Sequence, residues 1–284
     1  MAKEKKGVRL EHISKIYQDP KTKKEFYAVH DTTLDIEPGT FVTLLGPSGC
    51  GKTTTLRMIA GFESPDEGEI YLGNEAINAL TPNKRDTAMV FQSYALLPHY
   101  NVFDNVAYGL KIRKIQQKVG ITAVYVTHDQ SEAMSISDKI IIMSKGKVEQ
   151  IGTPREIYYH PKSRFVADFI GEANFLEARV EAVKGEKAAI TVSGQPLEVN
   201  NFAGAKPGDT ASLVIRPEAA GLSEDGLLDC KVTLSTFMGS YQYYQAKVGD
   251  VTVQITDYNP VNKKIYEVGE NVKLNFDPNG VYIL

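Results

Sequence analysis

The sequence predicts two domains: an α/β domain with a mostly parallel sheet and an antiparallel β subdomain (residues 1–170), then a small all-β, OB-like barrel (residues 171–284). Two observations lead to this prediction. A glycine-rich loop, residues 46–54, lies between a short apolar run and a helical pattern, as in α/β folds that bind phosphate. After Gly171 the helical periodicity disappears, and short alternating segments separated by turn residues continue to Leu284. The length of 284 residues also favours more than one hydrophobic core.

The composition is that of a soluble globular protein, with 42% hydrophobic and 24% charged residues. A net charge of -3 gives no electrostatic reason to expect a nucleic-acid partner. No apolar run approaches the ~20 residues of a membrane span, and no signal peptide follows the charged start, so any membrane role should be peripheral. The two cysteines, Cys50 and Cys230, suggest neither a disulfide framework nor a zinc site. We therefore expect a reduced, cytoplasmic protein.

The first domain should begin with two strands that deliver the chain to the loop. Residues 7–17 alternate like an edge strand, and residues 28–36 form the second strand. The apolar residues 40–45 are the strand before the loop, and residues 53–60 are a helix closed by Gly61. Later strands are expected at residues 69–72, 75–77, 87–91, 122–127, 139–143 and 148–151, and short helices at 154–158 and 164–170.

The loop reads Gly-Pro-Ser-Gly-Cys-Gly-Lys-Thr-Thr and fits the phosphate-loop pattern G-x-x-x-x-G-K-[ST] at every fixed position. Its glycines allow the backbone N–H groups to face one concavity, where the helix dipole adds positive charge. Lys52 would reach the β- and γ-phosphates, and the Thr53 hydroxyl would be a ligand of Mg²⁺. The alternative is an ordinary glycine-rich turn, which the strand and helix on either side disfavour. The expected nucleotide-binding residues of the loop are Gly46, Pro47, Ser48, Gly49, Cys50, Gly51, Lys52, Thr53 and Thr54.

Three further residues are candidates for the same site. Tyr17 ends the first strand and either stacks on an adenine or packs at the strand end. Gln92 ends a buried strand, where an amide can hold Mg²⁺ or an attacking water. His128 follows another strand and either bonds a γ-phosphate oxygen or is a structural histidine. Asp129 and Glu132 fit the capped start of a helix.

These residues together resemble the ATP-binding subunit of an ABC-type solute importer with a C-terminal TOBE domain. The resemblance covers nearly the whole chain. The segments that carry it are the loop at 46–54, Val90-Phe91-Gln92-Ser93-Tyr94-Ala95-Leu96, Val126-Thr127-His128-Asp129-Gln130, Gly152-Thr153-Pro154, Phe169-Ile170-Gly171-Glu172 and Ile215-Arg216-Pro217-Glu218.

The resemblance implies ATP and Mg²⁺ as cofactors, with Tyr17 stacking on adenine, Gln92 sensing the γ-phosphate and Mg²⁺, and His128 as the switch histidine. It also implies a head-to-tail dimer at the cytoplasmic face of the membrane. Two integral membrane permease subunits would dock near residues 93–108, from Ser93 to Tyr108, and an external solute-binding protein would act indirectly. From the residues alone, this aromatic stretch is either a docking patch or a plain core contact.

The chain departs from the family between Gln92 and His128. There the family carries a helical subdomain with the Leu-Ser-Gly-Gly-Gln signature, and then a Walker B strand ending in Asp-Glu; this sequence has neither. Residues 109–113 match the start of the subdomain, and residues 115–122 match the helix before the switch strand, which places a gap of several dozen residues at about Lys114. The string at residues 192–195 resembles the signature, but we expect a hairpin turn of the barrel there.

The gap affects hydrolysis more than binding. In the family the signature of one subunit closes over the γ-phosphate bound by the other, and the Walker B carboxylates hold Mg²⁺ and act as general base. Glu132 is a poor substitute because it belongs to a helix cap. As written, the chain should bind nucleotide but hydrolyse ATP poorly. A parallel sheet that loses an internal strand exposes unpaired backbone, so we expect the intact protein to contain the missing segment.

If the deletion is real, the alternative is a hydrolysis-incompetent nucleotide-binding or regulatory module in which the barrel is the working part. A small-molecule kinase is disfavoured because no acceptor-substrate motif is present. The stretches at residues 152–172 and 237–241 resemble importers of polyamines, ferric iron or phosphonates, and a sugar is a further alternative; of these we expect a polyamine as the imported solute.

Overall fold

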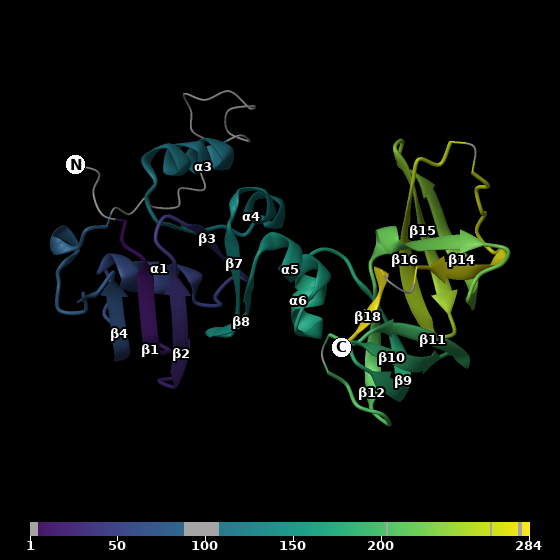
Figure 1. Cartoon of the computed structure of the whole chain (residues 1–284), viewed down its shortest axis with the longest axis horizontal. Coiled ribbons are helices and arrows are strands. Elements are labelled where there is room, and N and C mark those ends of the chain that lie inside the picture. Colours follow the sequence, from purple (N-terminus) through teal and green to yellow (C-terminus); the bar gives the residue numbers. More distant parts are fainter. Residues whose placement is uncertain (1–4, 88–107, 203, 262, 278–279) are drawn as a thin grey trace. The chain divides into compact units, whose positions relative to one another are not determined.

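We describe a computed structural model that covers residues 5–87, 108–202, 204–261, 263–277 and 280–284 (Figure 1). The chain divides into two compact units, Met1–Tyr159 and His160–Leu284. We predicted a boundary near Gly171, and helix α6 (Arg164–Phe169) lies in the second unit of this division. The two units are described separately.

The first unit begins with a four-stranded antiparallel sheet in the order β2-β1-β4-β5. Its strands are β1 (Val8–Gln18), β2 (Glu25–Ile36), β4 (Glu67–Leu72) and β5 (Glu75–Ala76), and the predicted hairpin at Gly73-Asn74 is confirmed. The prediction of an edge strand for β1 is wrong, because β1 pairs with β2 on one side and β4 on the other. Alternation of apolar and polar residues indicates that one face of the strand is buried, and here that face includes Val8, Leu10 and Ile13. The same pattern does not indicate how many strands pair with it.

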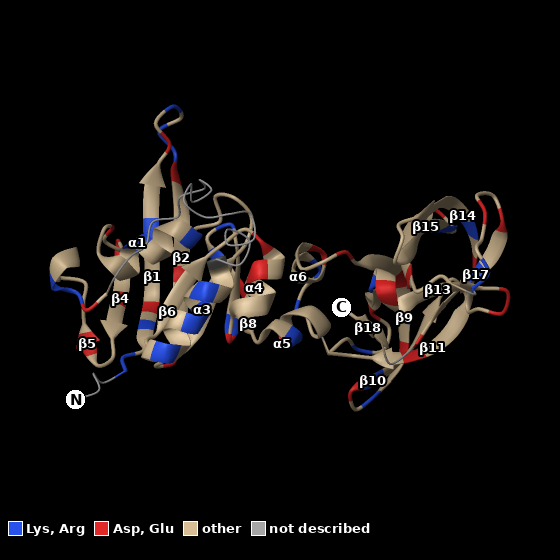
Figure 2. Cartoon of the chain, turned by 90° about the horizontal axis from the view of Figure 1, so that it is seen from above, with Lys and Arg blue, Asp and Glu red and all other residues tan. Residues whose placement is uncertain are grey.

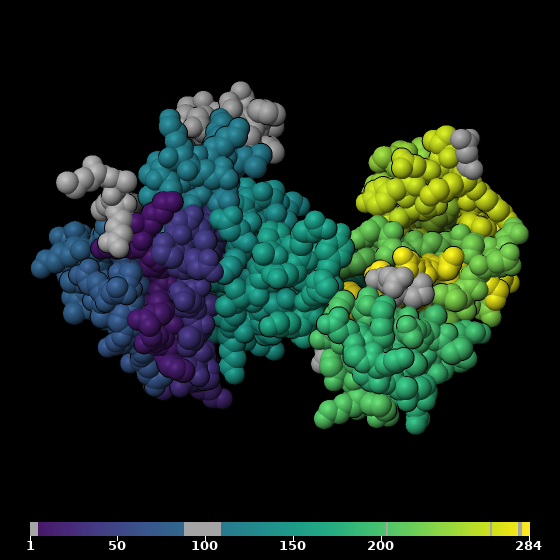
Figure 3. Space-filling model, viewed as in Figure 1, coloured from purple at the N-terminus to yellow at the C-terminus, as the bar shows by residue number. Residues whose placement is uncertain are grey.

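The second sheet of this unit has the order β6-β3-β7-β8. Strand β3 (Phe41–Leu45) pairs in parallel with β6 (Ala123–Val126) and β7 (Lys139–Ser144), and β8 (Lys147–Gly152) pairs antiparallel with β7. The helices are α1 (Lys52–Ala60), α3 (Tyr108–Val119), α4 (Gln130–Ile136) and α5 (Pro154–Tyr159), with a 3₁₀ turn η1 at Pro82–Lys84. Strand β2 of the antiparallel sheet lies beside β8 of the second sheet. In Figure 3 this is where the purple and blue surface of the first sheet meets the teal surface of the later residues of this unit.

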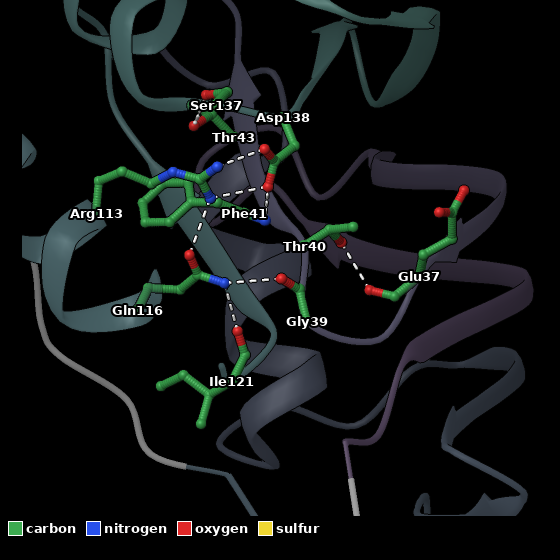
Figure 4. Close-up of polar contacts among 10 residues, drawn as sticks. All are labelled: Glu37, Gly39, Thr40, Phe41, Thr43, Arg113, Gln116, Ile121, Ser137 and Asp138. Carbon is green, nitrogen blue, oxygen red and sulfur yellow. Dashed lines mark hydrogen bonds and ion pairs between the residues drawn. The ribbon is translucent and has the colours of Figure 1, made fainter. Parts of the chain in front are cut away.

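Helix α3 runs without interruption across the position of the predicted gap. Arg113, which precedes the gap, donates from Nη1 to Oε1 of Gln116, which follows it, at 2.9 Å (Figure 4). Gln116 in turn donates to the carbonyl oxygens of Gly39 at 2.8 Å and Ile121 at 2.6 Å. Lysines and arginines gather along the same helix (Figure 2). The two segments that the family separates are therefore one helix here, and it is fixed to the start of β3.

Asp138 anchors this helix from the strand side. Its carboxylate accepts from both Nη atoms of Arg113 and from the backbone N–H of Phe41 at 2.8 Å (Figure 4). Burial alone would raise the pKa of Asp138, but the hydrogen bonds from Arg113 and Phe41 and the Arg113 charge outweigh it and hold that pKa below its usual range.

Strand β6 has one neighbour, β3, among the strands of the described residues. Its first three residues, Ala123, Val124 and Tyr125, are half-buried, whereas all five residues of β3 are buried. The other side of β6 therefore has no partner strand within the described part of the chain.

The described residues of the second unit form strands and their connections, apart from α6 and a 3₁₀ turn, η2 (Pro217–Ala219). Strands β10-β11-β18-β12-β9 form a closed barrel, and β13-β17-β14-β15-β16 form a second sheet. The predicted barrel and the turn at Ser193-Gly194, between β10 and β11, are confirmed. The bounds are β9 (Asn174–Lys184), β10 (Lys187–Val192), β11 (Gln195–Asn200), β12 (Thr210–Ile215), β13 (Ala220–Ser223), β14 (Leu228–Phe237), β15 (Tyr241–Val248), β16 (Val251–Tyr258), β17 (Asn271–Phe276) and β18 (Tyr282–Ile283).

Candidate phosphate-binding site

The glycine-rich loop joins the buried end of β3 to the first turn of α1, as the sequence predicts. Gly51 precedes the helix in a left-handed conformation with φ 105°, and no side chain caps the helix. The N–H groups of the first turn have no partner within a helix, so this end is suited to an anion. Gly49 has φ 78°, and a Cβ added there would meet nothing within 4 Å. The loop is therefore open at Gly49, where a ligand can approach the backbone.

Two other glycines allow the loop to pass close to its neighbours. A Cβ added to Gly46 would lie 2.2 Å from the carbonyl oxygen of Met143 on β7, and one added to Gly51 would lie 2.3 Å from that of Ala28 on β2. Behind the loop, the carbonyl of Cys50 accepts from the N–H of Gly146 at 3.2 Å. Close contacts with β7, with β2 and with the turn at Gly146 thus fix the backbone conformation of the loop.

The Lys52 side chain folds back over the first residues of the loop. Its ammonium donates to the carbonyl oxygens of Gly46 at 2.7 Å and Pro47 at 2.8 Å. Thr53, the next residue, is exposed on the first turn of α1, while the Thr55 hydroxyl bonds back to Gly51 at 3.0 Å. A cation and an exposed hydroxyl therefore lie beside a backbone suited to anions, a combination that fits a polyphosphate and the oxygen ligation that Mg²⁺ prefers.

The register of the parallel sheet brings His128 to the same edge. Leu44 of β3 is opposite Val126 of β6, so the loop and residues 127–128 leave the sheet at the same end. The His128 side chain is exposed. Parallel sheets commonly bind ligands at the carboxyl ends of their strands. The loop and His128 therefore lie at the same edge of the sheet, and the role of His128 stays a prediction.

Asp129 and Glu132 behave as the sequence predicts. Asp129 caps α4 by accepting from the N–H of Glu132 at 3.0 Å. The Glu132 carboxylate accepts from the Tyr125 hydroxyl at 3.0 Å, and a Cβ added to Gly109 of α3 would meet it at 2.5 Å. Glu132 is thus engaged between β6 and α3.

Tyr17 lies half-buried near the end of β1, with its ring 6.2 Å from that of Phe26. Burial raises the pKa of Tyr17, and a hydrogen bond to Glu63 and the charge of that carboxylate add to the effect. The structure leaves the adenine-stacking role as a prediction. Gln92 and residues 93–107, the predicted sensor and most of the predicted docking patch, lie outside the described residues.

Sequence reasoning missed Arg85. The residue is 6% exposed, and its guanidinium donates to the carbonyls of Met58 at 2.6 Å, Ile59 at 2.9 Å and Leu80 at 3.0 Å. Burial lowers the pKa of Arg85. The positive charge lies at the carboxyl end of α1, where it complements the helix dipole and fixes the helix that carries the loop. No local signal marks this arginine, because its acceptors are backbone carbonyls from two other segments.

Within the described residues no three His, Cys, Asp or Glu side chains converge on a possible metal site, and no helix there is long and apolar enough to cross a membrane. The loop, its lysine and the strand end define a phosphate-loop nucleotide-binding domain.

The family models and the sequence relatives agree with this class. The family model described as ABC transporter matches residues 29–161, and the TOBE domain model matches residues 213–284. The chain is 36% identical to the Fe(3+) ions import ATP-binding protein FbpC 1 of Rhizobium meliloti, over 91% of this chain and 94% of the relative. It is 37% identical to the spermidine/putrescine import ATP-binding protein PotA of Rubrobacter xylanophilus, over 86% of this chain and 84% of the relative. A nucleotide-free ATP-binding cassette of known structure aligns with TM-score 0.43 at 17% identity, over 59% of this chain and 100% of the other.

The chain belongs to the ATP-binding subunits of ABC transporters that carry a C-terminal TOBE domain. The alignment with the Rhizobium meliloti relative extends over 335 residues, more than the 284 of this chain, although it includes only 91% of them. The relative therefore carries several dozen residues that have no counterpart here.

Proposed function

We propose that this chain binds MgATP and energises the import of a small solute through an ABC transporter. The observation that supports the proposal most directly is the phosphate loop with Lys52 across it, at the sheet edge that His128 shares, in a chain whose relatives are named as import ATP-binding proteins. Two copies would pair head to tail at the cytoplasmic face of the membrane. Two permease subunits would dock near residues 93–108, and an external solute-binding protein would deliver the solute.

The residues of the site have distinct proposed roles. The loop amides and Lys52 stabilise negative charge on the phosphates, and Thr53 supplies a hydroxyl to the cation. Bound Mg²⁺ would neutralise charge that develops on the transferring phosphoryl group. Gln92 and His128 sense the γ-phosphate, and Tyr17 stacks on the base.

The general base is the part of the reaction that this sequence does not provide. Glu132, the acidic side chain next to the switch segment, is bonded to Tyr125 and faces α3. We propose that the catalytic glutamate belongs to the segment that the relatives carry and this sequence lacks. Strand β6 supports this proposal, because three of its four residues are half-buried and it has one partner among the described strands, so a further strand could pair with its other side. The comparisons lend no support to the alternative of a hydrolysis-incompetent module.

The mass of the intact protein purified from cells separates these two proposals. A mass several kilodaltons above the 31.3 kDa of this sequence, together with steady ATP turnover, would support a hydrolysing subunit that contains the missing segment. A mass of 31.3 kDa, with MgATP binding and no turnover above background, would instead support the non-catalytic module.

The proposed solute is a polyamine, followed by ferric iron, phosphonate and sugar. Of four relatives that are 35–37% identical to the chain, three are named for ferric iron and one for spermidine and putrescine, so these names do not favour polyamine over ferric iron. The test is stimulation of ATPase activity in the reconstituted transporter by its binding protein loaded with spermidine, ferric iron, a phosphonate or a sugar in turn. We expect only the spermidine-loaded binding protein to stimulate ATPase activity. Stimulation by the protein loaded with one of the other solutes would identify that solute as the substrate instead.

A further inference from the structure

Lys15 is a nearly buried cation where β1 meets the turn after α1. Its side chain is 12% exposed, and Nζ lies 3.1 Å from Oε1 of Glu63 and 3.2 Å from Oδ1 of Asp66. It also donates to the carbonyl oxygen of Ser64 at 2.9 Å. Burial lowers the pKa of Lys15, but the bonds to Glu63 and Asp66 raise it more, so the lysine stays charged. Such a cation is expensive to leave without its partners.

The same turn is bonded to the backbone on both sides. Asp66 accepts from the N–H of Ile16 at 2.7 Å, and the N–H of Asp66 donates to Ser14 at 2.9 Å. The N–H of Glu63 donates to the carbonyl of Arg57 in the last turn of α1 at 3.3 Å. The helix that begins at the phosphate loop is thereby connected to β1 at the level of Lys15.

Tyr17 is in contact with this network. The Lys15 ammonium lies 5.5 Å from the centre of the Tyr17 ring, within the range of a cation–π interaction. Phe26 contacts the ring at an interplanar angle of 46°. The Tyr17 side chain is thus in contact with Lys15 and Phe26 and is hydrogen-bonded to Glu63.

We propose that Lys15 and Glu63 are positioning residues for Tyr17, holding its ring as a flat surface for the nucleotide base. The network makes base recognition depend on the position of α1, and therefore on the phosphate loop. This inference rests on the proposed base-stacking role of Tyr17. It predicts that Lys15 affects recognition of the base and leaves recognition of the triphosphate unchanged.

The protein has no tryptophan, so Tyr17→Trp introduces a single indole at the position to be tested. Stacking of adenine on the indole should quench its fluorescence when MgATP binds. Mg²⁺-tripolyphosphate, which has no base, should bind without this quenching. Titrations of the full chain with the two ligands then separate base binding from phosphate binding.

Lys15→Met should lower the affinity for MgATP roughly fivefold and leave the affinity for Mg²⁺-tripolyphosphate within about twofold. Glu63→Gln should act in the same direction, and Lys15→Arg should restore most of the loss because it keeps the charge between the two carboxylates. In a Tyr17→Ala background, Lys15→Met should have no further effect on MgATP affinity. The matched control is Lys139→Met, which removes a different ion pair of the first unit, that with Glu37 at 2.6 Å.

Two results would overturn the inference while leaving Tyr17 at the base: equal losses of MgATP and tripolyphosphate affinity in Lys15→Met, or no loss of either. A third result would contradict the base-stacking role of Tyr17, on which the inference rests. If Tyr17→Ala leaves MgATP affinity unchanged and the indole does not respond to bound MgATP, then Tyr17 does not contact the base.

Discussion

Strands β3 and β6 are parallel neighbours in one sheet, yet their surroundings differ. Strand β3 is buried along its whole length and has a parallel partner on each side. Strand β6 is half-buried over three of its four residues and has a single partner among the described strands. The phosphate loop follows the first strand, and His128 follows the second.

This difference suggests that phosphate binding and ATP hydrolysis, the two steps of the proposed reaction, depend on different parts of the chain. Phosphate binding relies on β3, α1 and the two sheets behind the loop, all of which the first unit contains. For hydrolysis we propose a carboxylate from a segment beside β6, because Glu132, the acidic residue next to the switch segment, is bonded to Tyr125. Binding and hydrolysis should therefore respond to different substitutions.

The largest effect is expected from Gly51→Ala. A Cβ at φ 105° and 2.3 Å from the Ala28 carbonyl forces the loop away from β2, so the free energy of unfolding should fall by about 3 kcal/mol. Chemical denaturation monitored by circular dichroism measures this change. The matched control, Gly49→Ala, has open space around it and should lose only about 1 kcal/mol. Equal losses would contradict the close packing of the loop.

Lys52→Met should weaken MgATP binding roughly 50-fold, because the main cation of the loop is removed, and should leave the melting temperature nearly unchanged. Isothermal titration calorimetry measures the affinity. Lys231→Met, at an exposed lysine of the second unit, is the control and should bind like the original chain. If Lys52→Met keeps its affinity, nucleotide does not bind at this loop.

A smaller effect is expected at the anchor of α3. Asp138→Asn should lower the free energy of unfolding by about 1–2 kcal/mol at pH 7. Since the pKa of Asp138 is lower in the folded protein than in the unfolded chain, its stabilisation is complete above the unfolded value, about 4, and is lost as the pH falls through the folded value.

Denaturation at a series of pH values should therefore show the original chain and Asp138→Asn converging in acid. A double-mutant cycle with Arg113→Met assigns the effect to this pair. A difference that stays constant down to pH 2 would mean that the carboxylate is not stabilised by Arg113.

The smallest effect is expected at Ile115, whose side chain is 61% exposed on α3. Ile115→Ser should change the free energy of unfolding by less than about 0.5 kcal/mol, as is usual for an exposed position. Ile142→Ser, at a residue with 0% exposure, should cost several times more. If the protein isolated from cells loses more than about 1 kcal/mol on Ile115→Ser, then residues outside the described part cover this face.

Much of the fold was predictable because local signals and tertiary structure agree. The glycine pattern of the loop, the Asp129 cap and the Ser193-Gly194 turn depend on backbone geometry that neighbouring residues specify, and all three are confirmed. The family resemblance was predictable from the same loop and from the switch segment.

The rest depends on contacts between distant residues. The second partner of β1, the carbonyl acceptors of Arg85 and the network around Lys15 join segments far apart in sequence. No periodicity reports such contacts. The continuity of α3 was missed for a different reason, because the resemblance assigned its two halves to separate parts of the family fold.

Helix α3 is anchored twice, once on each side of Lys114: Arg113 holds Asp138, and Gln116 holds Gly39. Lys114 itself is exposed. If the chain were interrupted at this residue, each half of α3 would still be bonded to the sheet region. We therefore expect an insertion at position 114 to break the bond between Arg113 and Gln116 and to leave the strands that carry the phosphate loop unchanged.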